Sequence, residues 1–291
     1  MSRVLVTGAL GLLGSTLVPF LQARGHEVLR HARKGEVEIC ADLTDADQVC
    51  AALDAVAPEV IVNLAALTNV DECERNPQLA YLENVRIVEN LAKWIQKKAN
   101  ACHLVQLSTD QVYDGLGPHK ESNINLTNYY GFSKYAGELA AATASSTVLR
   151  TNFFGQSQCS GRTSLSDWLV QALTKGEPIT VFEDVRFSPL SLARLSEFLE
   201  IVIAKRQQGI YNLGSRDGMS KADFAFALAE ALGLPIRNMA RGTSGKAKLN
   251  AYRPKDMCMD SSLFANIFSV ELPTLKEEIQ AMRAAYGDDI G

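Results

Sequence analysis

The stretch GALGLLG, residues 8–14, decides the fold because it places a glycine at every third position, directly after the apolar run RVLV. In a strand-to-helix turn, Gly8 would permit the tight bend and Gly11 would let a pyrophosphate approach the backbone. Gly14 would let the helix and the strand pack closely. A turn that is merely tight would explain the glycines equally well, so other segments must decide between the two interpretations.

Outward from this turn, short apolar runs alternate with amphipathic helical stretches. The alternation predicts helices between the strands, the longest from about 76 to 98, and Pro19 predicts a mild kink in the first helix. Parallel strands need crossover connections, which are almost always right-handed, so we expect an α/β fold with a doubly wound parallel sheet covered by helices on both faces. The predicted strands are RVLVTG (3–8), HEVLRHA (26–32), VEIC (37–40), EVIVNLAA (59–66), HLVQLSTDQVY (103–113) and TVLRTNFFG (147–155).

After about residue 155 the pattern loosens. We expect a dinucleotide-binding domain over 1–155, with later segments rejoining its sheet, and a smaller C-terminal α/β substrate lobe mainly over 156–291. The segments typical of helices are SLSDWLVQALTKG (164–176), MSKADFAFALAEALG (219–233) and LPTLKEEIQAMRAAYG (272–287), and those typical of strands are PITVFE (178–183) and GIYNLGS (209–215).

Composition excludes several classes of function. The 291 residues carry 29 Lys and Arg against 33 Asp and Glu, without a dense basic cluster, which argues against nucleic acid as a partner. The N-terminal MSRVLV is unlike a signal peptide, and no run approaches the roughly 20 apolar residues that cross a bilayer, so we expect no membrane partner and a cytoplasmic location. The six cysteines and four histidines lack the spacing of metal ligands, which predicts free thiols and no metal.

The ends of the second and third strands bear on the cofactor. A site for NAD usually has an acid about 20 residues beyond the glycines, whereas a 2′-phosphate is better met by cations. The stretch LRHARKG (29–35) offers Arg30, Arg33 and Lys34 and no acid, which favours NADPH, with NADH as the second option. An exposed basic turn is the alternative. Asp42 and Leu43 would flank the adenine, unless Asp42 is only a turn residue.

The next two strand ends offer space and a hydroxyl group. Ala65 and Ala66, in NLAALTNVDECE, would leave room for a bulky ligand above the carboxyl edge of the sheet, although small side chains also serve helix packing. In LSTDQVY, Ser108 or Thr109 would offer a hydroxyl to a substrate oxygen, the alternative being a helix cap or a buried hydroxyl.

A tyrosine and a lysine in NYYGFSK, residues 128–134, are the candidates for proton transfer. Tyr130 and Lys134 are four residues apart and would project from one face of a helix, whereas Tyr129 has no such partner. A free tyrosine titrates near 10, and we expect the nearby ammonium to lower the pKa of Tyr130 and make it a usable acid. An ordinary surface pair on a helix would have the same spacing.

Taken in order, these motifs resemble the extended short-chain dehydrogenase/reductase superfamily over nearly the whole chain. Within it the sequence is most similar to dTDP-4-dehydrorhamnose reductases, on VIVNLAALTNVDECE, STDQVYDG, YYGFSKYAGE and YRPKDMCMDSSLF. The resemblance implies a Rossmann-like fold and a catalytic set of Thr109, Tyr130 and Lys134, with Lys134 also on the nicotinamide ribose. It implies cofactor contacts at Gly8, Gly11, Leu12, Leu13, Gly14, Arg30, Arg33, Asp42, Leu43, Asn63, Ala65 and Ala66, and a substrate pocket with Asp71, Asp110, Asn152 and Arg253.

The reaction implied by the resemblance is reduction of the 4-keto group of a nucleotide-linked 6-deoxyhexose by NAD(P)H. A dehydratase needs a carboxylate at position 111 to accept a proton. Gln111 has an amide there, which cannot accept it, and this argues against a dehydratase. An epimerase of the same superfamily and a non-catalytic NADP-binding regulatory subunit remain open, as does a homodimer. The stretch DVRFSPLS, residues 184–191, departs from the reductase pattern Gly-x-Pro-Thr and leaves the nucleotide and the sugar undetermined. Asp71 and Arg253 would also serve as an ordinary salt bridge.

Overall fold

The computed structural model describes residues 1–99 and 101–287. Seven parallel strands form one sheet in the order β11-β6-β5-β4-β1-β2-β3. The order reverses between β1 and β4, so the sheet is doubly wound, as predicted. The strands are β1 (Arg3–Thr7), β2 (Glu27–Ala32), β3 (Ile39–Cys40), β4 (Val60–Asn63), β5 (His103–Thr109), β6 (Ser146–Thr151) and β11 (Gly209–Leu213).

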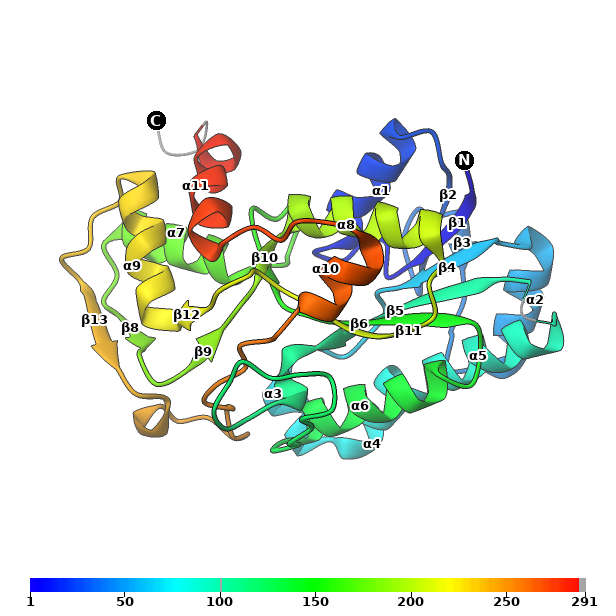
Figure 1. Cartoon of the computed structure of the whole chain (residues 1–291), viewed down its shortest axis with the longest axis horizontal. Helices are drawn as coiled ribbons and strands as arrows, with labels where there is room; N and C mark the ends of the chain where they lie inside the picture. The colour runs from blue at the N-terminus through cyan, green and yellow to red at the C-terminus, as the bar shows by residue number, and fades with distance from the viewer. Residues whose placement is uncertain (100, 288–291) are drawn as a thin grey trace.

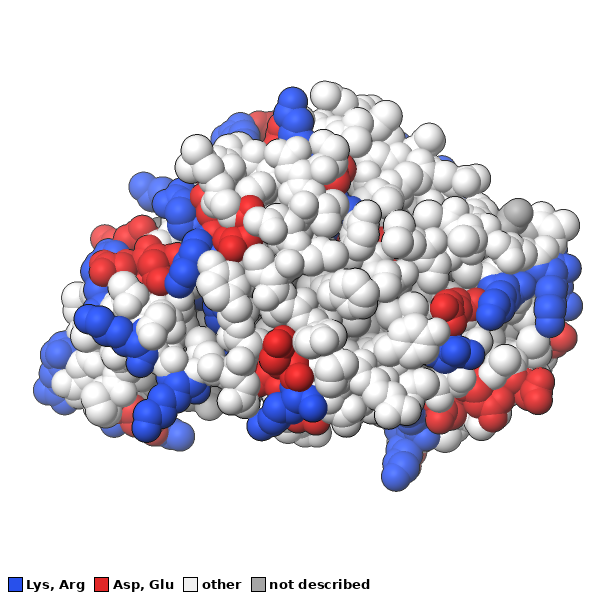
Figure 2. All heavy atoms as spheres, turned by 90° about the horizontal axis from the view of Figure 1, so that it is seen from below, with Lys and Arg blue, Asp and Glu red and all other residues white. Residues whose placement is uncertain are grey.

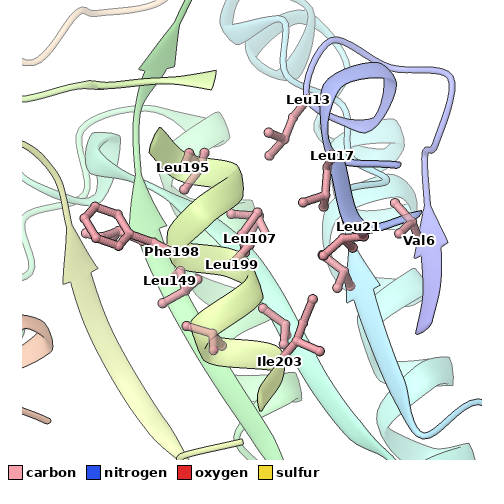
Figure 3. Packing of buried hydrophobic residues seen from close by; sticks show 14 of the residues in the cluster. Val6, Leu13, Leu17, Leu21, Leu107, Leu149, Leu195, Phe198, Leu199 and Ile203 are labelled. Carbon is pink, nitrogen blue, oxygen red and sulfur yellow. The ribbon is translucent and has the colours of Figure 1, made fainter. Parts of the chain in front are cut away.

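Helices cover both faces of this sheet (Figure 1). One face carries α1 (Gly14–Ala23), α8 (Leu192–Lys205) and α10 (Ser262–Phe268), and the other carries α2 (Ala46–Val56), α5 (Ile87–Lys97) and α6 (Tyr129–Ala141). The central strands β4 and β5 are buried at every residue and mostly apolar, because helices cover both of their faces. Figure 3 shows α1 and α8 over the sheet, with Leu17 and Leu21 of α1 and Leu195, Leu199 and Ile203 of α8 among the buried side chains near Val6, Leu107 and Leu149. Phe198 of α8 points away from α1 and packs against Phe264 of α10.

The long helix expected from 76 to 98 is present but contains a π turn. It consists of α4 (Pro77–Tyr81), the π turn η1 (Leu82–Arg86) and α5, and the short helix α3 (Val70–Arg75) precedes it. Asn76 caps α4 by accepting a hydrogen bond from the Leu79 amide at 3.1 Å, with proline at the first helical position. The extra residue of the π turn changes which side chains face inward, and Glu83 and Asn84 are both buried there.

The C-terminal residues build a second cluster of elements at one end of the molecule (Figure 1). Its core is a separate set of buried side chains that includes Phe154, Phe187 and Phe224, whose rings pack edge to face. Strand β11 rejoins the main sheet beside β6. The elements are α7 (Leu165–Lys175), α9 (Lys221–Leu232) and α11 (Leu275–Tyr286), with the strand pairs β8 (Ile179–Phe182) and β13 (Met239–Gly242), β9 (Arg186–Phe187) and β12 (Met219–Ser220), and β7 (Phe153–Phe154) and β10 (Leu190–Ser191).

The division into domains at residue 155 stays a prediction, and residues 288–291 of the expected lobe lie outside the described range. Among the described residues, no helix has the length and apolar character needed to span a bilayer. The same residues contain no group of three or more histidine, cysteine or acidic side chains able to hold a metal ion, and all six cysteines are free. On the face shown in Figure 2, acidic and basic side chains lie close to one another and form no large patch of one sign.

Candidate active site

One cavity of about 540 Å³ opens where the strand order reverses, at the carboxyl ends of the central strands. This is where open α/β sheets bind their ligands. The glycine turn lies along one wall of the cavity and α6 along another. The residues predicted from sequence that line it are Gly8, Gly11, Leu12, Leu13, Gly14, Arg33, Lys34, Leu43, Ala65, Ala66, Ser108, Thr109, Tyr130, Lys134 and Asn152.

The three glycines of the turn have different local environments. Gly8 has a φ of +63°, and a Cβ there would lie 3.0 Å from the Ala65 amide nitrogen. A Cβ on Gly14 would lie 2.5 Å from the Ala9 carbonyl oxygen, so this glycine is required by packing within the turn. A Cβ on Gly11 would meet only the Gly8 carbonyl oxygen, at 3.0 Å. Gly11 is therefore the glycine whose missing side chain leaves free space on the cavity side.

The residues present fit a dinucleotide cofactor. Helix α1 begins at Gly14 without a side-chain cap on its first amides, and the turn before it lines the cavity. Uncapped amides at a helix N-terminus bind phosphate through N–H donors and the helix dipole. Leu43 and Ile87 give apolar surface for a base on one side of the turn. Tyr130 and Lys134 lie on the other side, toward β5 and α6.

The basic residues after β2 do not all reach the cavity. The Arg30 guanidinium donates to both carboxylate oxygens of Glu38, at 2.7 and 2.9 Å, and is not among the lining residues. That contact lowers the pKa of Glu38 to about 2. Arg33 does line the cavity, where it donates to Glu83 at 2.5 Å, and Lys34 lies beside it. Residues 29–35 carry no acid, as noted from the sequence, but the fold brings Glu38, which directly precedes β3, to Arg30 and Glu83 of η1 to Arg33.

Two further predicted cofactor residues lie behind the wall. Asp42 accepts hydrogen bonds from the amide and the hydroxyl of Thr44, at 2.9 and 2.8 Å, which is the turn role left open above. Asn63 is buried between Thr7 and Gln106 and joins the ends of β1, β4 and β5. Neither lines the cavity. Asn63 and Thr7 position the chain segment that carries Ala65, since the Thr7 hydroxyl accepts a hydrogen bond from the Ala65 amide at 3.2 Å.

The proposed catalytic side chains converge from β5 and α6. Asn128 caps α6 by accepting from the Gly131 amide at 2.8 Å, and a Cβ at Gly131 would collide with the Gln111 carbonyl oxygen. This close approach brings Tyr130 beside Thr109, and both residues line the cavity. The Lys134 ammonium donates to the Leu107 carbonyl oxygen at 2.6 Å. One hydroxyl, one phenol and one ammonium thus line the same part of the cavity.

Electrostatics around this group differ from the expectation in one respect. Burial raises the pKa of Tyr130, and the hydrogen bond with Thr109 offsets only part of that rise. Burial also lowers the pKa of Lys134 to about 8. The predicted fall in the Tyr130 pKa is therefore wrong for this structure, because desolvation of the phenolate outweighs its stabilisation. A phenol with a raised pKa is protonated at neutral pH and is available as a proton donor.

The predicted substrate residues are held in two separate pairs. Asp110 is fully buried and accepts from the Asn152 amide at 2.7 Å, and burial raises the pKa of Asp110 to about 6. Asn152 lines the cavity and Asp110 lies behind it. Asp71 and Arg253 form a salt bridge at 2.8 Å away from the cavity lining, which is the alternative left open for them.

Several lining residues were not singled out from the sequence. Gln111 lines the cavity, and its place directly after the STD motif is a sequence signal that would have indicated this position. Glu83 and Ile87 give no signal, because the π turn determines which side chains of the long helix face the cavity. The residues missed are Leu10, His31, Ala32, Leu64, Thr68, Glu83, Ile87, Leu107, Thr151, Phe153, Arg162 and Thr163.

The chain is similar to known proteins over nearly its whole length. The family model described as RmlD substrate binding domain matches residues 2–287. The chain is 27% identical over 295 residues to "Probable low-salt glycan biosynthesis reductase Agl14" of Haloferax volcanii, covering 97% of this chain and 98% of that protein. It is 28% identical over 291 residues to methionine adenosyltransferase 2 subunit beta of Danio rerio, covering 96% and 89%. The structure of dTDP-4-dehydrorhamnose reductase from Bacillus anthracis in complex with NADP matches with a TM-score of 0.88 at 25% identity, covering 97% and 99%.

Proposed function

The chain belongs to the RmlD substrate binding domain family, and on this premise we propose that it reduces the 4-keto group of a nucleotide-linked 6-deoxyhexose with NAD(P)H, in the biosynthesis of an activated sugar. One observation carries the proposal: the cavity that begins at the glycine turn ends at Thr109, Tyr130 and Lys134. The similarity to a reductase whose structure contains NADP supports both the reaction class and the cofactor.

The chain's own groups account for cofactor binding. The start of α1 and the space beside Gly11 would receive the pyrophosphate, and Leu43 and Ile87 would lie against the adenine. Lys134 lines the cavity on the other side of the turn and would hold the nicotinamide ribose. When bound, the reduced cofactor supplies the hydride for the carbonyl carbon. NADPH is the cofactor we propose, and NADH is the second option.

Tyr130 supplies the proton. As the carbonyl carbon is reduced, negative charge develops on its oxygen, and Tyr130 and Thr109, which both line the cavity, are the candidate hydrogen-bond donors to that oxygen. In the structure the Thr109 hydroxyl donates to Asp110 at 3.3 Å and accepts from the Gln111 amide at 3.2 Å. Tyr130, which is protonated at neutral pH as any tyrosine of ordinary or raised pKa is, donates its proton to the developing alkoxide. Lys134, held by the Leu107 carbonyl, stabilises the phenolate that results.

The proposal is tested by NADPH oxidation with a panel of dTDP-, GDP- and UDP-linked 4-keto-6-deoxy sugars, followed by identification of the product. Stoichiometric loss of NADPH with formation of a 4-hydroxy sugar supports it. Conversion of a sugar without net NADPH consumption would assign the chain to the epimerases. Cofactor binding without conversion of any sugar would favour a regulatory subunit, the class suggested by the name of the Danio rerio relative, methionine adenosyltransferase 2 subunit beta. The intact Tyr130 and Lys134 favour the enzyme.

The nucleotide sugar is the expected partner, and a homodimer is part of the proposal. Helix α6 exposes Tyr129, Phe132 and Leu139 to 46, 56 and 54%. Together they form an apolar stripe that is unusual for an exposed helix face. A monomeric mass in multi-angle light scattering at micromolar concentration would contradict the dimer. The cytoplasmic location stays a prediction from the sequence.

A further inference from the structure

The Arg33–Glu83 ion pair lies on the side of the cavity away from the reacting groups. The sheet runs from β3 and β2 at one edge through β1 to β4, β5 and β6. Tyr130 and Lys134 face the β5 side, and the glycine turn follows β1 between them and β2. A dinucleotide with its pyrophosphate on that turn therefore has its adenosine near β2, where Arg33 and Glu83 line the cavity.

Glu83 is the fixed member of this pair. Its side chain is 11% exposed, whereas that of Arg33 is 61% exposed. The neighbouring Asn84 anchors the π turn: its side chain accepts from the Leu67 amide at 2.8 Å and donates to the Leu67 carbonyl at 3.0 Å and to the Ser133 hydroxyl at 2.9 Å. These contacts hold η1 between the segment after β4 and α6. The carboxylate of Glu83 is thus positioned by the fold, while Arg33 is free to turn toward solvent or ligand.

We propose that Glu83 sets the choice between NADPH and NADH by competing with a 2′-phosphate for Arg33; this inference rests on the proposed use of NAD(P)H. A 2′-phosphate needs the Arg33 guanidinium, and engaging it leaves the buried Glu83 carboxylate without its cation and next to a second anion. A 2′-hydroxyl leaves the ion pair intact and donates a hydrogen bond to the carboxylate. Glu83 therefore has the role usually taken by an acid at the end of the second strand.

The test compares cofactor binding in three proteins without any sugar present. Titration calorimetry gives dissociation constants for NADPH and NADH with the unmodified chain, Glu83→Gln and Glu38→Gln. We expect Glu83→Gln to raise the ratio of the NADH dissociation constant to the NADPH dissociation constant by about tenfold or more, so that NADPH is preferred more strongly. This is the size of one charge-assisted contact. Glu38→Gln removes a carboxylate that pairs with Arg30 outside the cavity lining, and we expect it to leave the ratio within about twofold.

An unchanged ratio in a folded Glu83→Gln protein, or an equal change for both cofactors, would overturn the proposal. If Glu83→Gln does not fold, Arg33→Met takes its place, because Arg33 is largely exposed. In that variant the dissociation constant of NADPH must rise by about tenfold and that of NADH must stay unchanged. Any other pattern contradicts the role of the pair. Failure of the unmodified chain to bind either cofactor would instead refute the proposed function.

Discussion

The cofactor end of the site and the candidate substrate groups consist of different kinds of chemical groups. At the cofactor end, the pyrophosphate part of the surface consists of backbone, glycines and small or apolar side chains close together in sequence, as in residues 8–14, and the Arg33–Glu83 pair lies beyond it. The candidate substrate groups are charged or amide side chains from distant segments, paired with one another, and of these only Asn152 lines the cavity. Asp71 and Arg253 are 182 residues apart, and Asp110 and Asn152 are 42 apart.

This difference affects how each end responds to change. A binding surface made of backbone is blocked only when a side chain is added, since no side chain contributes to it. A paired charge is lost when either partner is removed, and the remaining partner is left buried without compensation. Substitutions that add volume should therefore impair the cofactor end most. Substitutions that delete a polar group should instead impair the substrate end and the reacting groups.

The largest effect is expected for Tyr130→Phe, at the boundary between the two ends. The ring and its packing remain but the proton donor is deleted, so the turnover number should fall by roughly 10² to 10⁴ while NADPH affinity changes little. Tyr129→Phe is the matched control, because Tyr129 is 46% exposed on the same helix and Tyr130 is 8% exposed. A loss of reduction in Tyr129→Phe and not in Tyr130→Phe would place the active site elsewhere.

Gly11→Val tests the cofactor end by adding volume. A Cβ at Gly11 would meet only the Gly8 carbonyl oxygen, at 3.0 Å, so we expect the chain to fold cooperatively while the side chain fills cofactor space. We expect the dissociation constant of NADPH to rise by at least about 100-fold, since phosphate contacts of the helix N-terminus are blocked. Gly245→Val, at a glycine with no neighbour within 4 Å, is the control. Normal cofactor binding by Gly11→Val would show that the turn is only structural.

Asp71→Ala tests the substrate end by deleting a charge. Asp71 accepts hydrogen bonds from the amides of Asn250 and Ala251 and from Arg253, and so joins α3 to the segment before Lys255. Losing these contacts should lower the free energy of unfolding by about 1–3 kcal/mol in denaturant titration. An equal, near-zero effect for Asp71→Ala and Glu271→Ala would show that the pair contributes nothing to joining the two segments. Glu271 is 89% exposed and meets Arg216 at 3.7 Å.

The smallest effect is expected for the pH dependence contributed by Asp110. Its pKa is about 6 in the folded chain and close to the ordinary value of about 4 when unfolded. Between these values the folded state keeps a proton that the unfolded state has lost, so this group's contribution to stability falls as pH rises from about 4 to 6. Asp110→Asn should remove that fall, which unfolding curves at pH 4 and pH 7 would detect. Parallel pH profiles for both proteins would contradict the buried, raised pKa.

Most of the fold was predictable because its signals are local. The glycine turn, the apolar strands and the alternation of elements follow from residues close in sequence, and the doubly wound sheet is confirmed. The interruption of the long helix was not predictable, since a π turn has no period of its own in the sequence. The gathering of Thr109, Tyr130 and Lys134 in one cavity was expected from the order of the strand ends, and their catalytic roles remain predictions.

The sequence by itself determined the backbone features of this protein: where the chain turns tightly, which strands are buried on both faces, and which helix presents a tyrosine and a lysine four residues apart. Only the tertiary structure decided which charged side chains are free. Arg30 is held by Glu38, Arg33 by Glu83 and Arg253 by Asp71, and burial sets the pKa of Tyr130 and Asp110. The physical reason is that hydrophobic period and turn chemistry act over a few residues, whereas ion pairing and desolvation depend on groups that folding brings together from anywhere in the chain.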